Sequence, residues 1–142
     1  MLGILIALLS GALMSVQGIF NTEITKNTSL WISTGWVQLS AFAVCLIMWA
    51  VKGFESPAAL FQVEYKYMLL GGVLGTFITV TVIKSIAALG PAKSAMLIVI
   101  AQIFISYMIE VFGFFQVEPQ AFSLRKLAGV AVAVIGIIIF SK

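Results

Sequence analysis

Long apolar runs separated by short polar segments form the main pattern along the chain. A membrane-spanning helix needs about 20 mostly apolar residues, and five runs approach or exceed that length. They predict helices at about residues 2–20, 30–51, 67–89, 92–115 and 124–140. The last run is short unless Ser123 caps it and Leu124 begins it, with Arg125 and Lys126 extending to the membrane surface. The pattern therefore predicts an all-α integral membrane protein with five transmembrane helices.

The connections between these runs are short and carry turn and cap residues. Gly90-Pro91 predicts a tight turn, since Gly tolerates positive φ and Pro favours the first residue of a helix. Ser56 before Pro57 predicts the N-cap and first residue of a short helix at the membrane interface. The connections leave no room for a soluble domain, so residues 1–142 are expected to form a single five-helix transmembrane domain. Small residues recur at four-residue spacing along the first predicted helix, at Gly3, Ala7, Gly11 and Ser15. Such a stripe favours close helix packing in lipid.

The composition agrees with lipid as the solvent for most of the chain. Hydrophobic residues make up 62% of the 142 residues and charged residues 9%, against about 25% charged in a soluble domain. There is no His and only one Cys, which excludes His-based metal sites, an internal disulfide and multi-Cys clusters. We therefore expect no metal and no cofactor, and the absence of a nucleophile–base pair argues against an enzyme. The scattered basic residues argue against nucleic acid as a partner.

The same basic residues bear on how the chain inserts into the membrane. With five spans, they divide evenly between the N-terminal side and the opposite side, as Lys52, Lys66, Arg125 and Lys126 against Lys26, Lys84, Lys93 and Lys142. Four against four, or four against three when Lys84 is counted as intramembrane, gives almost no orientation preference under the positive-inside rule. A five-span chain inserted both ways supplies two copies related by an axis in the membrane plane, as in inverted-repeat transporters. The even division of Lys and Arg between the two membrane sides therefore predicts an antiparallel homodimer of ten helices.

Polar residues inside the apolar runs are candidate functional positions, because ionisable groups are costly in the membrane. Glu110 is the main candidate. Gln102 and Ser106 share its helical face at four-residue spacing, and Tyr107 precedes it by one turn. Desolvation favours a neutral carboxyl, so an unpaired Glu110 could bind and release a proton or neutralise a cationic substrate. The alternative is a structural role near the lipid headgroups.

Lys84 is the other ionisable residue at comparable depth, close to the opposite membrane face. Within one chain it differs in depth from Glu110 by roughly 18 Å at 1.5 Å per residue, so the two cannot pair there. In an antiparallel dimer, Glu110 would lie level with Lys84, Gln17 and Asn21 of the partner, which predicts an intersubunit polar cluster. The alternative is that Lys84 extends to the membrane surface and that Gln17 and Asn21 only bond to neighbouring helices.

The order and spacing of several short motifs resemble one known family. The first helix ends with Gln17-Gly18 and Asn21, and the third opens with Gly71-Gly72 and Gly75. The motifs that follow are Leu89-Gly90-Pro91-Ala92, Ala101-Gln102, Ser106, Ile109-Glu110, Phe112-Gly113 and the run from Ser123 to Lys126. This arrangement resembles one repeat of the drug/metabolite transporter superfamily, and more closely its single-repeat YdcZ-like family of inner-membrane exporters.

The resemblance covers nearly the whole chain and implies that two copies form a ten-helix transporter with inverted symmetry. The family usually has Asp-His before its Phe-Gly pair, where this chain has Glu110-Val111. The carboxylate is retained and the imidazole is absent, which excludes a mechanism that uses a His and leaves Glu110 alone.

These observations together predict a secondary-active transporter in a bacterial-type inner membrane. We expect a proton-coupled exporter of small amphiphilic or cationic compounds that acts as a dual-topology homodimer. Its predicted substrate- or proton-binding residues are Glu110, Gln102, Ser106, Tyr107, Gln17, Asn21 and Lys84. The alternative is a non-transporting or heterodimeric half-unit of a membrane complex.

Overall fold

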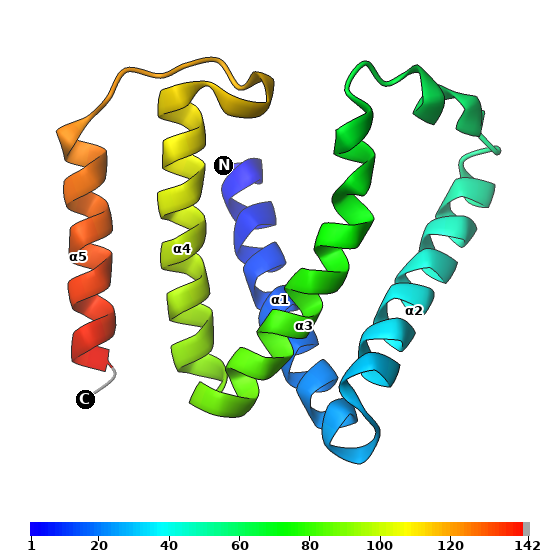
Figure 1. Ribbon diagram of the computed structural model, residues 1–142, viewed down its shortest axis with the longest axis horizontal. Coiled ribbons are helices and arrows are strands. Elements are labelled where there is room, and N and C mark those ends of the chain that lie inside the picture. The colour runs from blue at the N-terminus through cyan, green and yellow to red at the C-terminus, as the bar shows by residue number, and fades with distance from the viewer. Residues whose placement is uncertain (141–142) are drawn as a thin grey trace. The chain divides into compact units, whose positions relative to one another are not determined.

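A computed structural model describes residues 1–140, and every regular element in that range is a helix (Figure 1). The chain divides into two compact units, Met1–Ala88 and Leu89–Lys142. Within residues 1–140, four helices are long and apolar enough to cross a membrane: Leu2–Asn27, Leu30–Val51, Lys66–Leu89 and Pro91–Phe112. The prediction of an all-helical membrane protein is thus confirmed. The fifth helix, α5 (Leu124–Phe140), has 17 residues, and its crossing of the membrane stays a prediction.

The first unit begins with α1 (Leu2–Asn27), which is seven residues longer than the predicted 2–20. The apolar run ends at Phe20, but the polar residues that follow satisfy their own hydrogen bonds within the helix. Thr22, Thr25 and Thr28 each donate a hydroxyl to the carbonyl four residues earlier, at 2.7 to 2.8 Å. Glu23 pairs with Lys26 one turn later, a spacing that supports a helix. The apolar run therefore marks the part of α1 that suits lipid, which is shorter than the helix.

The second helix, α2 (Leu30–Val51), has the bounds that the sequence predicts. Its N-cap is Ser29, whose side chain accepts a hydrogen bond from the Ile32 N–H at 3.3 Å. The fully buried Ser33 hydroxyl donates to the Asn21 carbonyl of α1 at 2.9 Å. This bond joins α1 and α2 close to the turn between them.

The third helix, α3 (Gly71–Leu89), follows two short 3₁₀ helices, η1 (Pro57–Gln62) and η2 (Lys66–Leu70). Ser56 accepts a hydrogen bond from the Ala58 N–H, which confirms the predicted cap before Pro57. On the α2 side, Gln38 donates to the Thr76 hydroxyl at 3.3 Å. On the α1 side, Gly18 lies so close to α3 that a Cβ at that position would be 2.7 Å from Cδ1 of Ile86.

The second unit contains α4 (Pro91–Phe112), η3 (Phe114–Gln116) and α5. Gly90 has a φ of +80° and Pro91 begins α4, as predicted for this turn. The predicted end of α4 at residue 115 is wrong, because Gly113 adopts the left-handed conformation (φ +67°) and its N–H donates to Ile109. The connection then folds back, and the Gln120 N–H donates to the Glu110 carbonyl at 2.8 Å. In Figure 1, α4 and α5 lie side by side and run in opposite directions.

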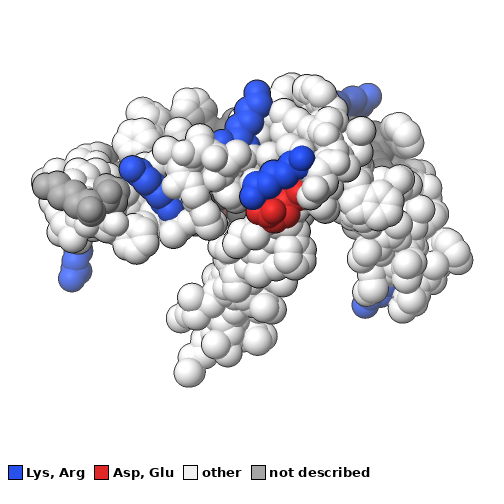
Figure 2. Space-filling model, turned by 90° about the horizontal axis from the view of Figure 1, so that it is seen from below, with Lys and Arg blue, Asp and Glu red and all other residues white. Residues whose placement is uncertain are grey.

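Few side chains are buried in this structure. Among the described residues the buried hydrophobic side chains are Val37, Val80, Ile83, Tyr107 and Ile137. Most of the large apolar side chains lie on the outer surfaces of the helices. On the face seen in Figure 2, scattered basic side chains and an acidic group that lies against one of them stand on a surface that is otherwise uncharged. An apolar surface of this extent is stable only when lipid or another protein surface covers it.

Candidate functional site between α4 and α5

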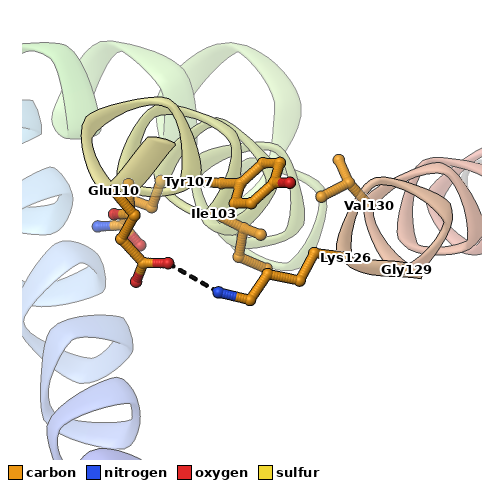
Figure 3. A pocket seen from close by; sticks show the side chains of 8 residues that line it. Ile103, Tyr107, Glu110, Lys126, Gly129 and Val130 are labelled. Carbon is orange, nitrogen blue, oxygen red and sulfur yellow. Dashed lines mark hydrogen bonds and ion pairs between the residues drawn. The ribbon is translucent and has the colours of Figure 1, made fainter. Parts of the chain in front are cut away.

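A hollow of about 490 Å³ lies between α4 and α5 in the second unit (Figure 3). Its volume falls in the range of roughly 300–1,000 Å³ that is usual for small-molecule sites. Both helices contribute to its walls, with Gln102, Ile103, Ser106, Tyr107 and Glu110 from α4 and Lys126, Gly129 and Val130 from α5. The hollow therefore combines polar, charged and apolar groups within the two helices.

Four of the residues predicted from the sequence meet in this hollow. Gln102, Ser106 and Glu110 lie on one face of α4 because they are four residues apart, and Tyr107 lies beside them. Gln102 and Ser106 are exposed to the open side, whereas the Tyr107 side chain is only 4% exposed. The helical spacing alone was enough to group these four side chains.

The hollow contains an ion pair that sequence analysis missed. Glu110 Oε2 lies 2.9 Å from Nζ of Lys126 on α5, and the two side chains are 42% and 53% exposed. Figure 3 shows the two side chains extending toward each other from the facing helices. The pair gives Glu110 a partner within its own chain, which agrees with the alternative of a structural role. The extension of Lys126 to the membrane surface stays a prediction. The connection returns α5 antiparallel to α4, which brings the first turn of α5 next to the last turn of α4.

Tyr107 holds the beginning of α5 in place. Its hydroxyl donates to the Ser123 carbonyl at 3.1 Å and accepts from the Ser123 N–H at 2.7 Å. Ser123 directly precedes α5, so these two bonds fix where that helix starts. Lys126 follows three residues later, and its Nζ lies 5.6 Å from the centroid of the Tyr107 ring, which is within cation–π range. Tyr107 thus positions the ammonium group that Glu110 binds.

The other three predicted site residues belong to the first unit. Gln17 and Lys84 are exposed, whereas Asn21 is buried. The Asn21 carbonyl accepts hydrogen bonds from the Ser33 and Thr25 hydroxyls. The intersubunit cluster of Glu110 with Lys84, Gln17 and Asn21 stays a prediction. Lys142, which the charge balance also counts, lies outside the described residues.

A second hollow, of about 640 Å³, lies farther along the same two helices. Apolar side chains and small residues line it, with Met96, Val99 and Ile100 from α4 and Gly136, Ile137 and Phe140 from α5 among them. It has no ionisable side chain in its walls. Residues 1–140 also contain no group of three or more Cys, Asp or Glu side chains that could hold a metal ion. The two hollows thus offer one ion pair, the neutral polar side chains of Gln102, Ser106 and Tyr107, and apolar walls.

Comparison with known proteins identifies the family of this chain. No match was found among curated proteins or among solved structures. A family model matches residues 2–139, which include both helices of the hollow and nearly all of the chain. The resemblance seen in the sequence is therefore confirmed, and the chain belongs to the family described as "Putative inner membrane exporter, YdcZ".

Proposed function

We propose that the protein is a proton-coupled, secondary-active exporter of small amphiphilic compounds. Glu110 would be the group that binds the coupling proton or a cationic part of the substrate. The observation that carries this proposal is the Glu110–Lys126 pair in an open hollow, where Glu110 lies on α4, a helix long enough to span a membrane. The family's description as an exporter supports the direction of transport.

The ion pair suggests how binding would be coupled to movement. A charge inside a membrane is costly unless it is paired, so Glu110 and Lys126 stabilise each other while the hollow is empty. A proton on Glu110 removes one of the two charges, and the ionic contact between α4 and α5 is lost with it. The two Tyr107–Ser123 hydrogen bonds would then remain as a polar link between these helices. The proposed cycle therefore alternates between a paired and a released state of α4 and α5.

The proposed assembly is a dual-topology homodimer with five spans in each copy. The even division of Lys and Arg between the two sides supports insertion in both orientations. The extensive exposed apolar surface supports a second covering partner in addition to lipid. Reporter domains fused after residue 142 should be found on both sides of the membrane. A single orientation of all molecules would instead favour a heterodimeric half-unit.

Transport can be tested in liposomes that carry the purified protein and a trapped pH-sensitive dye. Addition of octyltrimethylammonium or an octyl zwitterion against an imposed proton gradient should produce a protein-dependent proton flux. Glu110→Gln should abolish this flux while the protein remains folded. Glu118→Gln is the matched control, because Glu118 is exposed in the connection before α5 and outside the hollow. Unchanged flux in Glu110→Gln would remove Glu110 from the mechanism.

A further inference from the structure

We infer that the hollow between α4 and α5 selects zwitterionic amphiphiles over simple cations. This inference rests on the proposed export function and narrows its substrate class. It follows from three features of the same two helices: the paired charges, the fixed aromatic ring beside them and the apolar hollow next to them.

The ion pair determines which charged groups a ligand needs in order to bind in the hollow. Glu110 and Lys126 are 2.9 Å apart and each about half exposed, so a ligand entering the hollow meets both. A ligand with a single ammonium group would bind Glu110 and leave the Lys126 ammonium without its partner. A ligand with both an ammonium and an acid group replaces both halves of the pair, so no charge is left unpaired. Truncating one side of a charge pair is costly for the same reason.

Tyr107 offers a place for the ligand's ammonium group. Two hydrogen bonds to Ser123 hold the ring, and the Lys126 ammonium lies 5.6 Å from its centroid. Tyr107 is only 4% exposed with Lys126 in place, so a ligand's ammonium can reach the ring beside the Glu110 carboxylate only after Lys126 turns toward the acid group of the ligand. Aromatic faces and carboxylates both attract ammonium groups. After this rearrangement the ligand's ammonium contacts Tyr107 and Glu110, and the Lys126 ammonium contacts the ligand's acid group.

The apolar part of the ligand has a surface of its own. Ile103 and Val130 lie in the walls of the charged hollow (Figure 3). The second hollow follows along α4 and α5 and has apolar walls. A short alkyl chain attached to the zwitterionic group would lie along this surface. The geometry therefore assigns an amphiphile with a zwitterionic head and an apolar tail.

The test uses four compounds with the same octyl tail. They are N-octyl-N,N-dimethylglycine (zwitterion), octyltrimethylammonium (cation), octanoate (anion) and octyl glucoside (neutral). Binding is measured by calorimetry on the full-length protein in a maltoside detergent. The wild type should bind the zwitterion about tenfold or more tightly than either singly charged compound. Equal or tighter binding of the cation would overturn the inference.

Four variants test whether the ion pair causes this preference. Lys126→Gln should shift the preference to the cation, and Glu110→Gln should shift it to the anion. Exchange of the two charges, Glu110→Lys with Lys126→Glu, should retain the preference for the zwitterion. Arg125→Gln is the control, since Arg125 is adjacent to Lys126 but outside the hollow, and its preference should equal that of the wild type. An unchanged zwitterion preference in Lys126→Gln would overturn the inference.

A zwitterionic amphiphile can come from the water or from the bilayer, and nanodiscs distinguish the two. Nanodiscs of phosphatidylglycerol alone are compared with nanodiscs that also contain phosphatidylethanolamine. Weaker binding of octyl-dimethylglycine in the presence of phosphatidylethanolamine identifies a lipid headgroup as the ligand, and unchanged binding identifies a soluble one.

The zwitterion site and the export function can fail separately. Zwitterion binding without proton flux would refute the proposed export but leave the zwitterion-binding site supported. Proton flux with a preference for the cation would refute the zwitterion site and keep the export.

Discussion

Removal of the Tyr107 hydroxyl tests whether this residue joins α4 to the start of α5. In Tyr107→Phe the ring stays and only the hydroxyl is lost. That hydroxyl makes two hydrogen bonds with Ser123, one as donor at 3.1 Å and one as acceptor at 2.7 Å. The substitution therefore leaves a backbone N–H and a carbonyl at the start of α5 without this partner.

The expected loss follows from the number of these bonds. A hydrogen bond contributes about 0.5–1.5 kcal/mol net to folding, and bonds between membrane helices average roughly 0.6 kcal/mol. Two bonds next to a side chain that is only 4% exposed should thus contribute about 1–3 kcal/mol. The free energy of unfolding should fall by that amount in Tyr107→Phe.

Unfolding by dodecyl sulfate in mixed micelles, followed by circular dichroism, measures this free energy. The control is Tyr65→Phe, because Tyr65 is 39% exposed in the connection before α3; it should lose less than about 0.5 kcal/mol. The hydroxyl of Tyr107 also sets the position of Lys126, so Tyr107→Phe should weaken zwitterion binding as well. Equal stability of Tyr107→Phe and Tyr65→Phe would refute the link between α4 and α5.

The remaining predictions concern the packing of the helices and use the same unfolding measurement. Gly18→Leu should lose about 1–3 kcal/mol, because Ile86 of α3 occupies the space, whereas Gly11→Leu, with nothing within 4 Å, should change little. Gly113→Ala should lose about 1–2 kcal/mol, since φ is +67° and Pro119 lies 2.7 Å from the added Cβ; Gly71→Ala, in open space, is its control. Ser33→Ala should lose about 0.5–1.5 kcal/mol through its bond to Asn21, and a neutral result would refute that contact.

Local patterns were sufficient where a feature depends on neighbours along the chain. The face that joins Gln102, Ser106 and Glu110 follows from helical spacing, and the turn at Gly90-Pro91 follows from backbone preferences of these residue types. The end of α4 was set three residues too late because Phe114 and Phe115 continue the apolar run. The left-handed Gly113 ends the helix regardless of hydropathy.

The partner of Glu110 could not be read from local patterns. Lys126 is 16 residues away, and the contact depends on how the connection returns α5 against α4. The spacing of residues within one helix does not indicate where the connection places α5 relative to α4. One available signal was the run from Ser123 to Lys126 itself, which places a cation in the first turn of α5. We expected that cation to extend to the membrane surface, as Lys side chains near helix ends commonly do.

The most direct test of the site is protection of a single thiol in the hollow. Ser106 lines the hollow and is exposed, so Ser106→Cys in a Cys45→Ala background provides one reactive position. Octyl-dimethylglycine or octyltrimethylammonium should slow its labelling by a water-soluble maleimide, and Phe61→Cys, outside the hollow in η1, should react at an unchanged rate. Equal labelling of Ser106→Cys with and without either compound, while the same protein still transports it in liposomes, would contradict the assignment of the transport site to the hollow between α4 and α5.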